Sequence, residues 1–174
     1  MNITVLRLGH RPHRDKRLST HLILCARALG AEKVIYSGEE DPRLEEGIGD
    51  IVERWGGEFS IEYDSNWRGV VKQWKGNIVH LTMYGIPVEE GAPMISETEE
   101  PLLVVVGGPK VPRDMYEHAT WNVSVTNQPH SEVSALAIFM LLLQGEDALK
   151  HDFSGGSIQI TPSERGKCVE VSKD

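Results

Sequence analysis

Short apolar segments alternate with amphipathic ones through most of the sequence, and this alternation limits the possible folds more than any other feature. The apolar segments are rich in β-branched residues and are bounded by Gly, Pro or Asn, which is typical of strands. They lie at residues 2–8, 33–37, 58–63, 77–83, 101–107 and 121–125. The pattern predicts an α/β fold, with a mainly parallel sheet and helices on both of its faces.

Four segments, three between these strands and one after the last strand, have the pattern of helices. They lie at residues 17–31, 41–57, 65–76 and 130–145, and the last is the most apolar. In the first, apolar side chains recur at spacings of three and four, and Gly30 is the predicted C-cap. In the second, Asp41 is the predicted N-cap and Pro42 stands in the first turn.

The C-terminal residues follow a different pattern. Two alternating runs, 157–161 and 167–171, are joined by a turn rich in Pro, Ser and Gly, which predicts a β-hairpin. We therefore expect a main domain over residues 1–152 and a hairpin extension over residues 153–174. Capping of a sheet edge and contact with a substrate or a second subunit are both open roles for this hairpin.

The charge of the chain is unevenly distributed. The formal net charge is −8, yet residues 1–33 hold seven basic and two acidic residues, whereas residues 39–64 hold ten acidic and two basic ones. The acidic segment alone accounts for the negative balance and leaves a basic patch near the N-terminus. A solvated face is one interpretation; the dense run "GHRPHRDKR" favours phosphate binding.

The two cysteines, Cys25 and Cys168, lie far apart and lack metal-ligand spacing, so no structural metal is expected. Cys25 lies in an apolar run, where a buried small hydrophobe is the simplest interpretation. No run reaches the roughly 18 apolar residues that a membrane span needs. The N-terminal residues lack the apolar core of a signal peptide, and we expect a cytoplasmic location.

Polar or glycine-rich turns follow three of the predicted strands. Ligands of open α/β sheets bind outside the carboxyl ends of the strands. The turn residues are Leu81, Thr82, Met83, Tyr84 and Gly85, then Gly107 and Gly108, and then Thr126, Asn127 and Gln128. The phosphate-loop pattern G-x-x-x-x-G-K-[ST] and the dinucleotide pattern G-x-G-x-x-G are both missing. An apolar, backbone-rich pocket of this kind suits an adenine and a sulfonium cation better than a triphosphate.

Three segments resemble the motifs of the SPOUT superfamily of S-adenosylmethionine-dependent RNA methyltransferases. They are "HRPHRDKRLSTHLILCARALGA", "LLVVVGGPKVP" and "VTNQPHSEVSALAIFMLLL", and the resemblance covers roughly residues 3–145. The stretches "GHRPHRDKRLSTH", "GGPKVP" and "TNQPHSEVSALA" are most similar to the archaeal tRNA methyltransferases that modify the 2′-hydroxyl of the T-loop cytidine at position 56. The resemblance implies a deep trefoil knot near the C-terminus, a C-terminal hairpin, a tRNA substrate and a homodimer with sites at the subunit interface.

The resemblance also implies which residues bind S-adenosylmethionine. They are Leu81, Thr82, Gly107, Gly108, Pro109, Lys110, Val111, Val125, Thr126, Asn127, Gln128, Pro129, His130, Ser131 and Glu132. Ser131 and Glu132 are also candidates to orient substrate groups from the other subunit. The chain departs from the superfamily in two places: Pro109-Lys110 stands where Gly-x-Glu is usual, and His130-Ser131-Glu132 stands where Ser-Leu-Asn is usual.

The first motif supplies the candidate catalytic residues Arg14, Arg17 and His21. An arginine side chain stays charged in proteins, so we expect it to orient the substrate and neutralise a phosphate rather than act as a base. Arg17 is favoured because it lies at the predicted start of the helix, and His21 is the competing base.

Two other classes of function are open to the sequence. A non-catalytic RNA-binding module would keep this scaffold without the chemistry. A small hydrolase using His80 or His118 is disfavoured because no G-x-S-x-G pattern is present. His80 lies inside a predicted strand and is interpreted as a satisfied core histidine.

Overall fold

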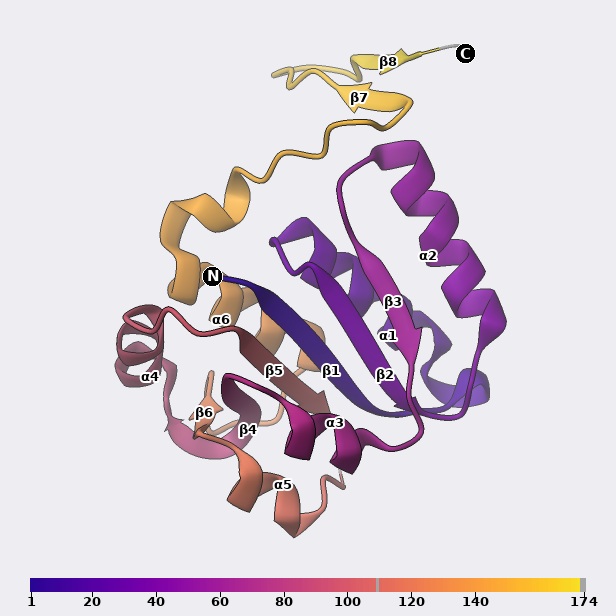
Figure 1. Cartoon of the computed structure of the whole chain (residues 1–174). Helices are drawn as coiled ribbons and strands as arrows, with labels where there is room; N and C mark the ends of the chain where they lie inside the picture. Colours follow the sequence, from indigo (N-terminus) through magenta and orange to yellow (C-terminus); the bar gives the residue numbers. More distant parts are fainter. Residues whose placement is uncertain (109, 173–174) are drawn as a thin grey trace.

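The computed structural model describes residues 1–108 and 110–172 and contains a six-stranded sheet in the order β3-β2-β1-β5-β4-β6. Its strands are β1 (Ile3–His10), β2 (Lys33–Gly38), β3 (Ser60–Tyr63), β4 (Asn77–Pro87), β5 (Leu102–Gly107) and β6 (Trp121–Ser124). Every neighbouring pair is parallel, which confirms the predicted parallel sheet (Figure 1).

Helices cover both faces of this sheet, as predicted. The helices are α1 (Pro12–Ala28), α2 (Pro42–Trp55), α3 (Trp67–Gln73), α4 (Val88–Ser96), α5 (Arg113–His118) and α6 (Glu132–Gln144), and α6 runs into a 3₁₀ turn at Gly145–Leu149. Buried residues of α1, α2, α4 and α6 form one apolar cluster with the sheet, and those of α3 and α5 form the other. The sequence did not predict α4 and α5, which are short; α4 also contains a proline at position 93.

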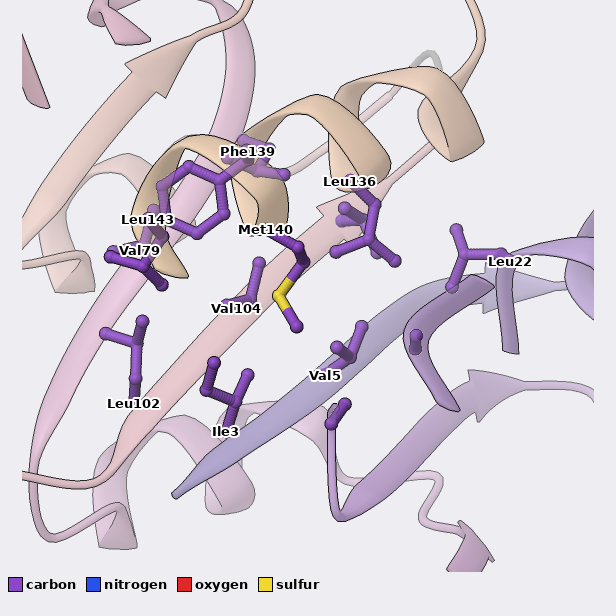
Figure 2. Packing of buried hydrophobic residues seen from close by; sticks show 14 of the residues in the cluster. Ile3, Val5, Leu22, Val79, Leu102, Val104, Leu136, Phe139, Met140 and Leu143 are labelled. Atoms are coloured by element: carbon purple, nitrogen blue, oxygen red, sulfur yellow. The ribbon is translucent and has the colours of Figure 1, made fainter. Parts of the chain in front are cut away.

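Alternation along each strand sends side chains to the two clusters in turn. In β1, Val5 packs toward α6 and Leu6 toward the opposite face. Figure 2 shows Leu136 and Met140 of α6 lying over Val5 and Val104 of the sheet. Because residues i and i+2 of a strand share a face, the position of Val5 also places the side chain of Arg7 on the α6 side.

The N-terminal helix starts earlier than the sequence predicted. α1 begins at Pro12, whose fixed φ suits the first turn of a helix, whereas the apolar periodicity begins only one turn and a half later. Arg17 therefore lies in the second turn, and its predicted place at the helix start is wrong. At the other end the C-cap is Leu29, one residue before the predicted Gly30, and Gly30 follows it with φ +85°.

The start of α2 was predicted correctly. Asp41 is its N-cap, and the carboxylate accepts a hydrogen bond from the backbone N–H of Leu44 at 3.2 Å. Pro42 occupies the first helical position, where its missing N–H costs nothing. Local chemistry alone decides this boundary.

Strand β4 leaves its partner β6 and then returns to it. Leu81 and Ile86 both pair with Val123, so residues 82–85 form an excursion from the sheet. Gly85 stands where this excursion rejoins β6, and a Cβ there would overlap the backbone of Asn122. Only a glycine permits so close an approach of two backbones.

The C-terminal hairpin is present and forms a sheet of its own. β7 (Ile158–Ile160) and β8 (Val169–Val171) pair antiparallel. The segment before them is fastened near the end of α2, where the Arg27 guanidinium lies 4.5 Å from the Phe153 ring centroid and Gly57 N–H donates to the Ser154 carbonyl at 2.9 Å. The domain boundary at residue 152 and the trefoil knot stay predictions.

Two smaller findings concern helices and cysteines. Within the described residues, no helix is long and apolar enough to cross a membrane. Cys25 is half-buried rather than fully buried, with Sγ 3.9 Å from the Val133 carbonyl, and burial raises the pKa of its thiol. Cys168 is exposed.

Candidate functional site

A cavity of about 640 Å³ opens at the carboxyl ends of β4, β5 and β6. Its walls come from the excursion within β4, the glycine turn after β5 and the loop between β6 and α6. A volume of this size lies within the usual range of small-molecule sites. The cavity is therefore where the three turns singled out in the sequence meet.

Most residues of the predicted cofactor site line this cavity. These are Leu81, Thr82, Gly107, Gly108, Val111, Val125, Thr126, Gln128, Pro129, His130, Ser131 and Glu132. Two others do not: Lys110 is exposed, and the Asn127 side chain instead donates to the Met83 carbonyl at 2.9 Å. Pro109 lies outside the described residues.

The chemistry of the walls fits S-adenosylmethionine. Among the described residues that line the cavity there is no lysine or arginine, the side chains that usually hold phosphates. Leu81, Val106 and Val111 offer apolar surface for an adenine, and Glu132 offers one carboxylate for a cation. A ligand that is flat and apolar at one end and cationic at the other matches this set of groups.

The two glycines after β5 keep the cavity open. A Cβ on Gly107 would overlap the Val111 side chain, and a Cβ on Gly108 would lie 3.6 Å from Glu132 Oε1. Gly107 thus lets Val111 close against the turn, and Gly108 leaves room beside the carboxylate. Backbone groups are accessible to a ligand here because no side chain covers them.

His80 lines the same cavity, although only 1% of its surface is exposed. The Tyr116 carbonyl accepts from Asn122 Nδ2 at 3.0 Å, which turns Asn122 Oδ1 toward His80 Nδ1 at 2.9 Å. Nδ1 therefore carries the proton, while Nε2 has no partner among the described residues. Burial lowers the pKa of His80, which keeps the ring neutral. The prediction of a satisfied core histidine is right for Nδ1 and wrong for Nε2.

A second, smaller cavity of about 270 Å³ lies between β1, the start of α1 and the loop before α6. From β1 and α1 it is lined by Arg7, Gly9, Arg11, Arg14, Asp15 and Leu18. Gly108, His130, Ser131 and Glu132 line both cavities and form the wall between them. The basic N-terminal patch therefore adjoins the glycine turns directly.

The described charged residues that line the second cavity form two ion pairs, and one arginine remains unpaired. Arg11 Nε donates to Asp15 Oδ2 at 2.9 Å, and this hydrogen bond holds the pKa of Asp15 below its usual value. Arg7 Nη2 lies 3.4 Å from Glu132 Oε2, and burial raises the pKa of Glu132 despite this arginine. No ion pair of Arg14 is found in the part of the chain that the structure describes. Among the described residues that line this cavity, Arg14 is thus the cation without an ion-pair partner.

The three predicted catalytic residues are not brought together. Arg14 lines the second cavity, whereas Arg17 and His21 are exposed on α1 and line neither cavity. The helix begins at Pro12, so the turn that faces the cavity is the one carrying Arg11 and Arg14.

The sequence analysis missed several residues of the two cavities. His80, Val106, Tyr116 and Ala135 line the first, and Arg7, Gly9, Arg11, Asp15 and Leu18 line the second; Met83 and Tyr84, which the sequence analysis named as turn residues, also line the first. Two of them carry a signal in the sequence, since Arg7 and His80 each stand between two apolar residues of a strand. A buried cation or imidazole inside a strand indicates a site when one of its polar atoms lacks a protein partner, because burying a polar group costs free energy unless it is paired.

Comparison with known proteins agrees with this geometry. The family model described as tRNA ribose 2′-O-methyltransferase, aTrm56, matches residues 55–170. The chain is 50% identical to the tRNA (cytidine(56)-2′-O)-methyltransferase of Methanothermobacter thermautotrophicus over 100% of this chain and 99% of the relative. It is 51% identical to the protein of the same name from Thermococcus kodakarensis, over 96% of each chain.

Solved structures share the fold at much lower identity. The TrmH/SpoU tRNA modifying enzyme of A. aeolicus superposes with a TM-score of 0.62 at 16% identity, over 88% of this chain and 80% of that one. The SpoU methyltransferase AviRb from Streptomyces viridochromogenes, solved with AdoMet, gives 0.58 at 14% identity, over 84% of this chain and 58% of that one. The chain therefore spans little more than half of AviRb, but nearly the whole of the two sequence relatives. With half its residues identical to those relatives and a family model matched over most of its length, the chain belongs to the tRNA ribose 2′-O-methyltransferase family.

Proposed function

We propose that this protein methylates the 2′-hydroxyl of the cytidine at position 56 of tRNA, with S-adenosylmethionine as the methyl donor. Relatives about half identical over their full length carry this activity in their names. Because the substrate is tRNA, the protein acts in the cytoplasm. In this proposal the first cavity holds the methyl donor and the second receives the target ribose.

One observation carries this assignment: among the described residues, a cavity lined by no lysine or arginine shares a wall with a cavity lined by an arginine that has no ion-pair partner. The shared wall is formed by Gly108, His130, Ser131 and Glu132. Methyl transfer to a nucleotide needs a donor and an acceptor in van der Waals contact, and only adjoining sites allow this. The charges divide as the two ligands require, with the arginines on the side of the phosphates.

S-Adenosylmethionine, when bound, supplies a methyl group that its sulfonium has already activated. The residues of this chain then bind, orient and exclude water. Val106 and Val111 present apolar surface, and the Gly107-Gly108 turn presents backbone groups. Tyr116, whose hydroxyl lies 3.2 Å from Thr82 Oγ1, ties the β4 excursion to α5 and closes this cavity.

The first-motif residues act on the phosphates of the tRNA. Arg14 lines the second cavity without an acidic partner among the described residues and is placed to neutralise a phosphate beside the target ribose. Arg17 and His21 are exposed further along α1 and extend the same basic surface. Phosphate contacts of this kind position a nucleic acid without reading its sequence.

The protein acts as a homodimer in this proposal, and α6 carries the argument. Leu136, Met140 and Leu143 of α6 are buried in the core, yet Ile138 and Leu142 on its other side are 42% and 49% exposed. A helix that is apolar all round is buried on all sides. A second copy of the chain covers this face, close to the second cavity, and completes the substrate site.

The test is to incubate the protein with tritium-labelled S-adenosylmethionine and an unmodified tRNA transcript, and to map the label by nuclease digestion. We expect label in the ribose of cytidine 56. The matched control is the same transcript made with 2′-O-methylcytidine at that position, which should accept no label. Label on a base or on another nucleotide would contradict the proposed target. Cofactor and tRNA binding without any label would favour the non-catalytic RNA-binding module.

A further inference from the structure

Glu132 occupies a place that no other carboxylate in the described residues shares. It lines both cavities, whereas Asp15, the other acid near them, lines only the second. Asp15 is also held by two hydrogen bonds from Arg11, from Nε at 2.9 Å and from Nη2 at 3.4 Å. Both carboxylate oxygens of Asp15 are therefore occupied by Arg11, and Glu132 is the acid that lies between the two cavities.

The hydrogen-bonding capacity of Glu132 is not used up. Its side chain is 19% exposed, and Arg7 Nη2 lies 3.4 Å from Oε2 without making a hydrogen bond. Arg7 is itself 2% exposed, and its Nε also lacks a partner among the described residues. Buried polar atoms are nearly always hydrogen-bonded in folded proteins, so two such atoms on neighbouring side chains indicate a place where a polar ligand group binds.

We propose that Glu132 is the general base of methyl transfer: its carboxylate accepts the proton of the ribose 2′-hydroxyl at the wall between the two cavities. The inference rests on the proposed function. Arg7 is its positioning residue. The Arg7 guanidinium, which extends from β1, lies against the Glu132 carboxylate and also donates a hydrogen bond to the Leu8 carbonyl.

The step balances without a further reactant. The 2′-oxygen gives its proton to a carboxylate oxygen of Glu132 and forms a bond to the methyl carbon. The carbon–sulfur bond breaks, and its electron pair stays on sulfur, which becomes neutral. The proton on Glu132 then passes to water through the second cavity, which restores the carboxylate. A positioned base of this kind contributes about 100-fold or more to a rate.

Other charged groups near Glu132 set its behaviour with pH. Arg7 faces it from β1, Arg11 and Asp15 act on it from α1, and His130 precedes it in the same loop. Burial is the main influence and raises the pKa of Glu132, the arginines lower it, and Asp15 raises it. A raised pKa makes the carboxylate a stronger base. It also means that the ionised form costs folding free energy at neutral pH, a cost that a neutral side chain avoids.

His130 is the rival for the same role, since it lines both cavities and its Nδ1 lies 3.1 Å from the Ser131 carbonyl. It is exposed and lies in the loop, whereas Glu132 is held by the first turn of α6 and by Arg7. A base needs a fixed position relative to the proton that it takes, which favours Glu132.

The experiment measures single-turnover methylation of tRNA against pH for wild type, Glu132→Gln, Glu132→Asp and His130→Gln, with Glu53→Gln as the control. Glu53 is an exposed acid on α2, so its variant should match wild type. S-Adenosylmethionine affinity is measured by calorimetry and the unfolding midpoint by thermal melting. In wild type we expect the rate to rise with pH and reach a plateau, as Glu132 loses its proton.

Glu132→Gln should lower the plateau rate about 100-fold and abolish the rise with pH, and the melting midpoint should stay at or above the wild-type value. Cofactor affinity should fall far less than the rate, because Glu132 is only one of the many residues that line the first cavity. Glu132→Asp should keep the rise at a reduced rate, and His130→Gln should keep it as well. A rise that persists in Glu132→Gln, or one lost in His130→Gln alone, would overturn the inference. So would a loss of cofactor affinity in Glu132→Gln that matches its loss of rate. A wild-type protein that transfers no methyl group at all would instead refute the proposed function.

Discussion

Two buried polar clusters lie at the carboxyl end of β1, and they differ in how completely they are hydrogen-bonded. One joins Arg7 to Glu132 between the two cavities. The other, which we call the His10 cluster, consists of His10, Ser19, Tyr36, Asp41 and Glu45. Arg7 and His10 are only three residues apart in the sequence. The comparison separates a cluster built for a ligand from one built for the fold.

The His10 cluster satisfies itself. His10 Nδ1 lies 2.8 Å from Ser19 Oγ, and Nε2 lies 3.3 Å from Asp41 Oδ2. Asp41 also caps α2, and its N–H donates to the Tyr36 hydroxyl at 3.0 Å. A serine, a histidine and an aspartate in contact have the composition of a nucleophilic site. All three are buried here, so a substrate cannot reach them.

The Arg7–Glu132 cluster is incomplete by comparison. Arg7 Nε and Glu132 Oε2 have no hydrogen-bond partner among the described residues, and Glu132 lines a cavity on each side. Unpaired buried polar atoms cost stability, and they are kept where a ligand completes the network. Residue types alone would have pointed to the wrong cluster. The two clusters differ in whether their polar atoms are hydrogen-bonded and in whether a ligand can reach them.

The largest effect is expected from Arg7→Met, which removes the positioning guanidinium at similar volume. Glu132 then loses its nearest cation, and its pKa rises further. At neutral pH the single-turnover rate should fall about 100-fold, and the rise of rate with pH should move to higher pH. A pH–rate profile checks this. An unchanged profile would show that Arg7 does not act on Glu132, and the two clusters would then be alike.

His10→Ala should instead act on stability. It leaves the Ser19 hydroxyl and the Asp41 carboxylate buried without their partner and creates a cavity, at a cost of about 2 kcal/mol in free energy of unfolding. Denaturant unfolding measures this cost. Methyl transfer, assayed where the variant is still folded, should stay close to wild type. A large loss of activity with stability retained would show that the His10 cluster takes part in catalysis. The two clusters would then not differ in function.

Tyr36→Phe gives the smallest effect. The hydroxyl accepts from Asp41 N–H and donates to Glu45 at 2.6 Å, so its loss should cost about 1 kcal/mol. Burial and Glu45 raise the pKa of Tyr36, so this contribution is complete below the pKa of a free tyrosine and is lost only as pH rises through the higher folded value. Denaturation at pH 7 and pH 9 should therefore give the same difference between variant and wild type. A difference that shrinks by pH 9 would show that the hydroxyl ionises there.

The parallel sheet, the start of α2 and most of the first cavity followed from the sequence, because each depends on nearby residues. Asp41 and Pro42 start a helix by contacts within four positions, and the carboxyl ends of parallel strands meet wherever such a sheet forms. The turns at Leu81, Gly107 and Thr126 therefore came together as expected. Apolar periodicity misplaced the start of α1, since its first turn is polar and faces the second cavity.

Only the tertiary structure decided which distant residues meet. Arg7 reaches Glu132 because the register of β1 turns its side chain toward α6, and His80 reaches Asn122 because β4 pairs with β6. The sequence marks Arg7 and His80 as polar residues between two apolar residues of a strand without naming their partners. Local preferences act over a few residues, whereas these contacts depend on how strands far apart in the chain are ordered in the sheet. For that reason the sequence by itself determined the class of fold and the cofactor turns, and packing determined the wall where Glu132 stands.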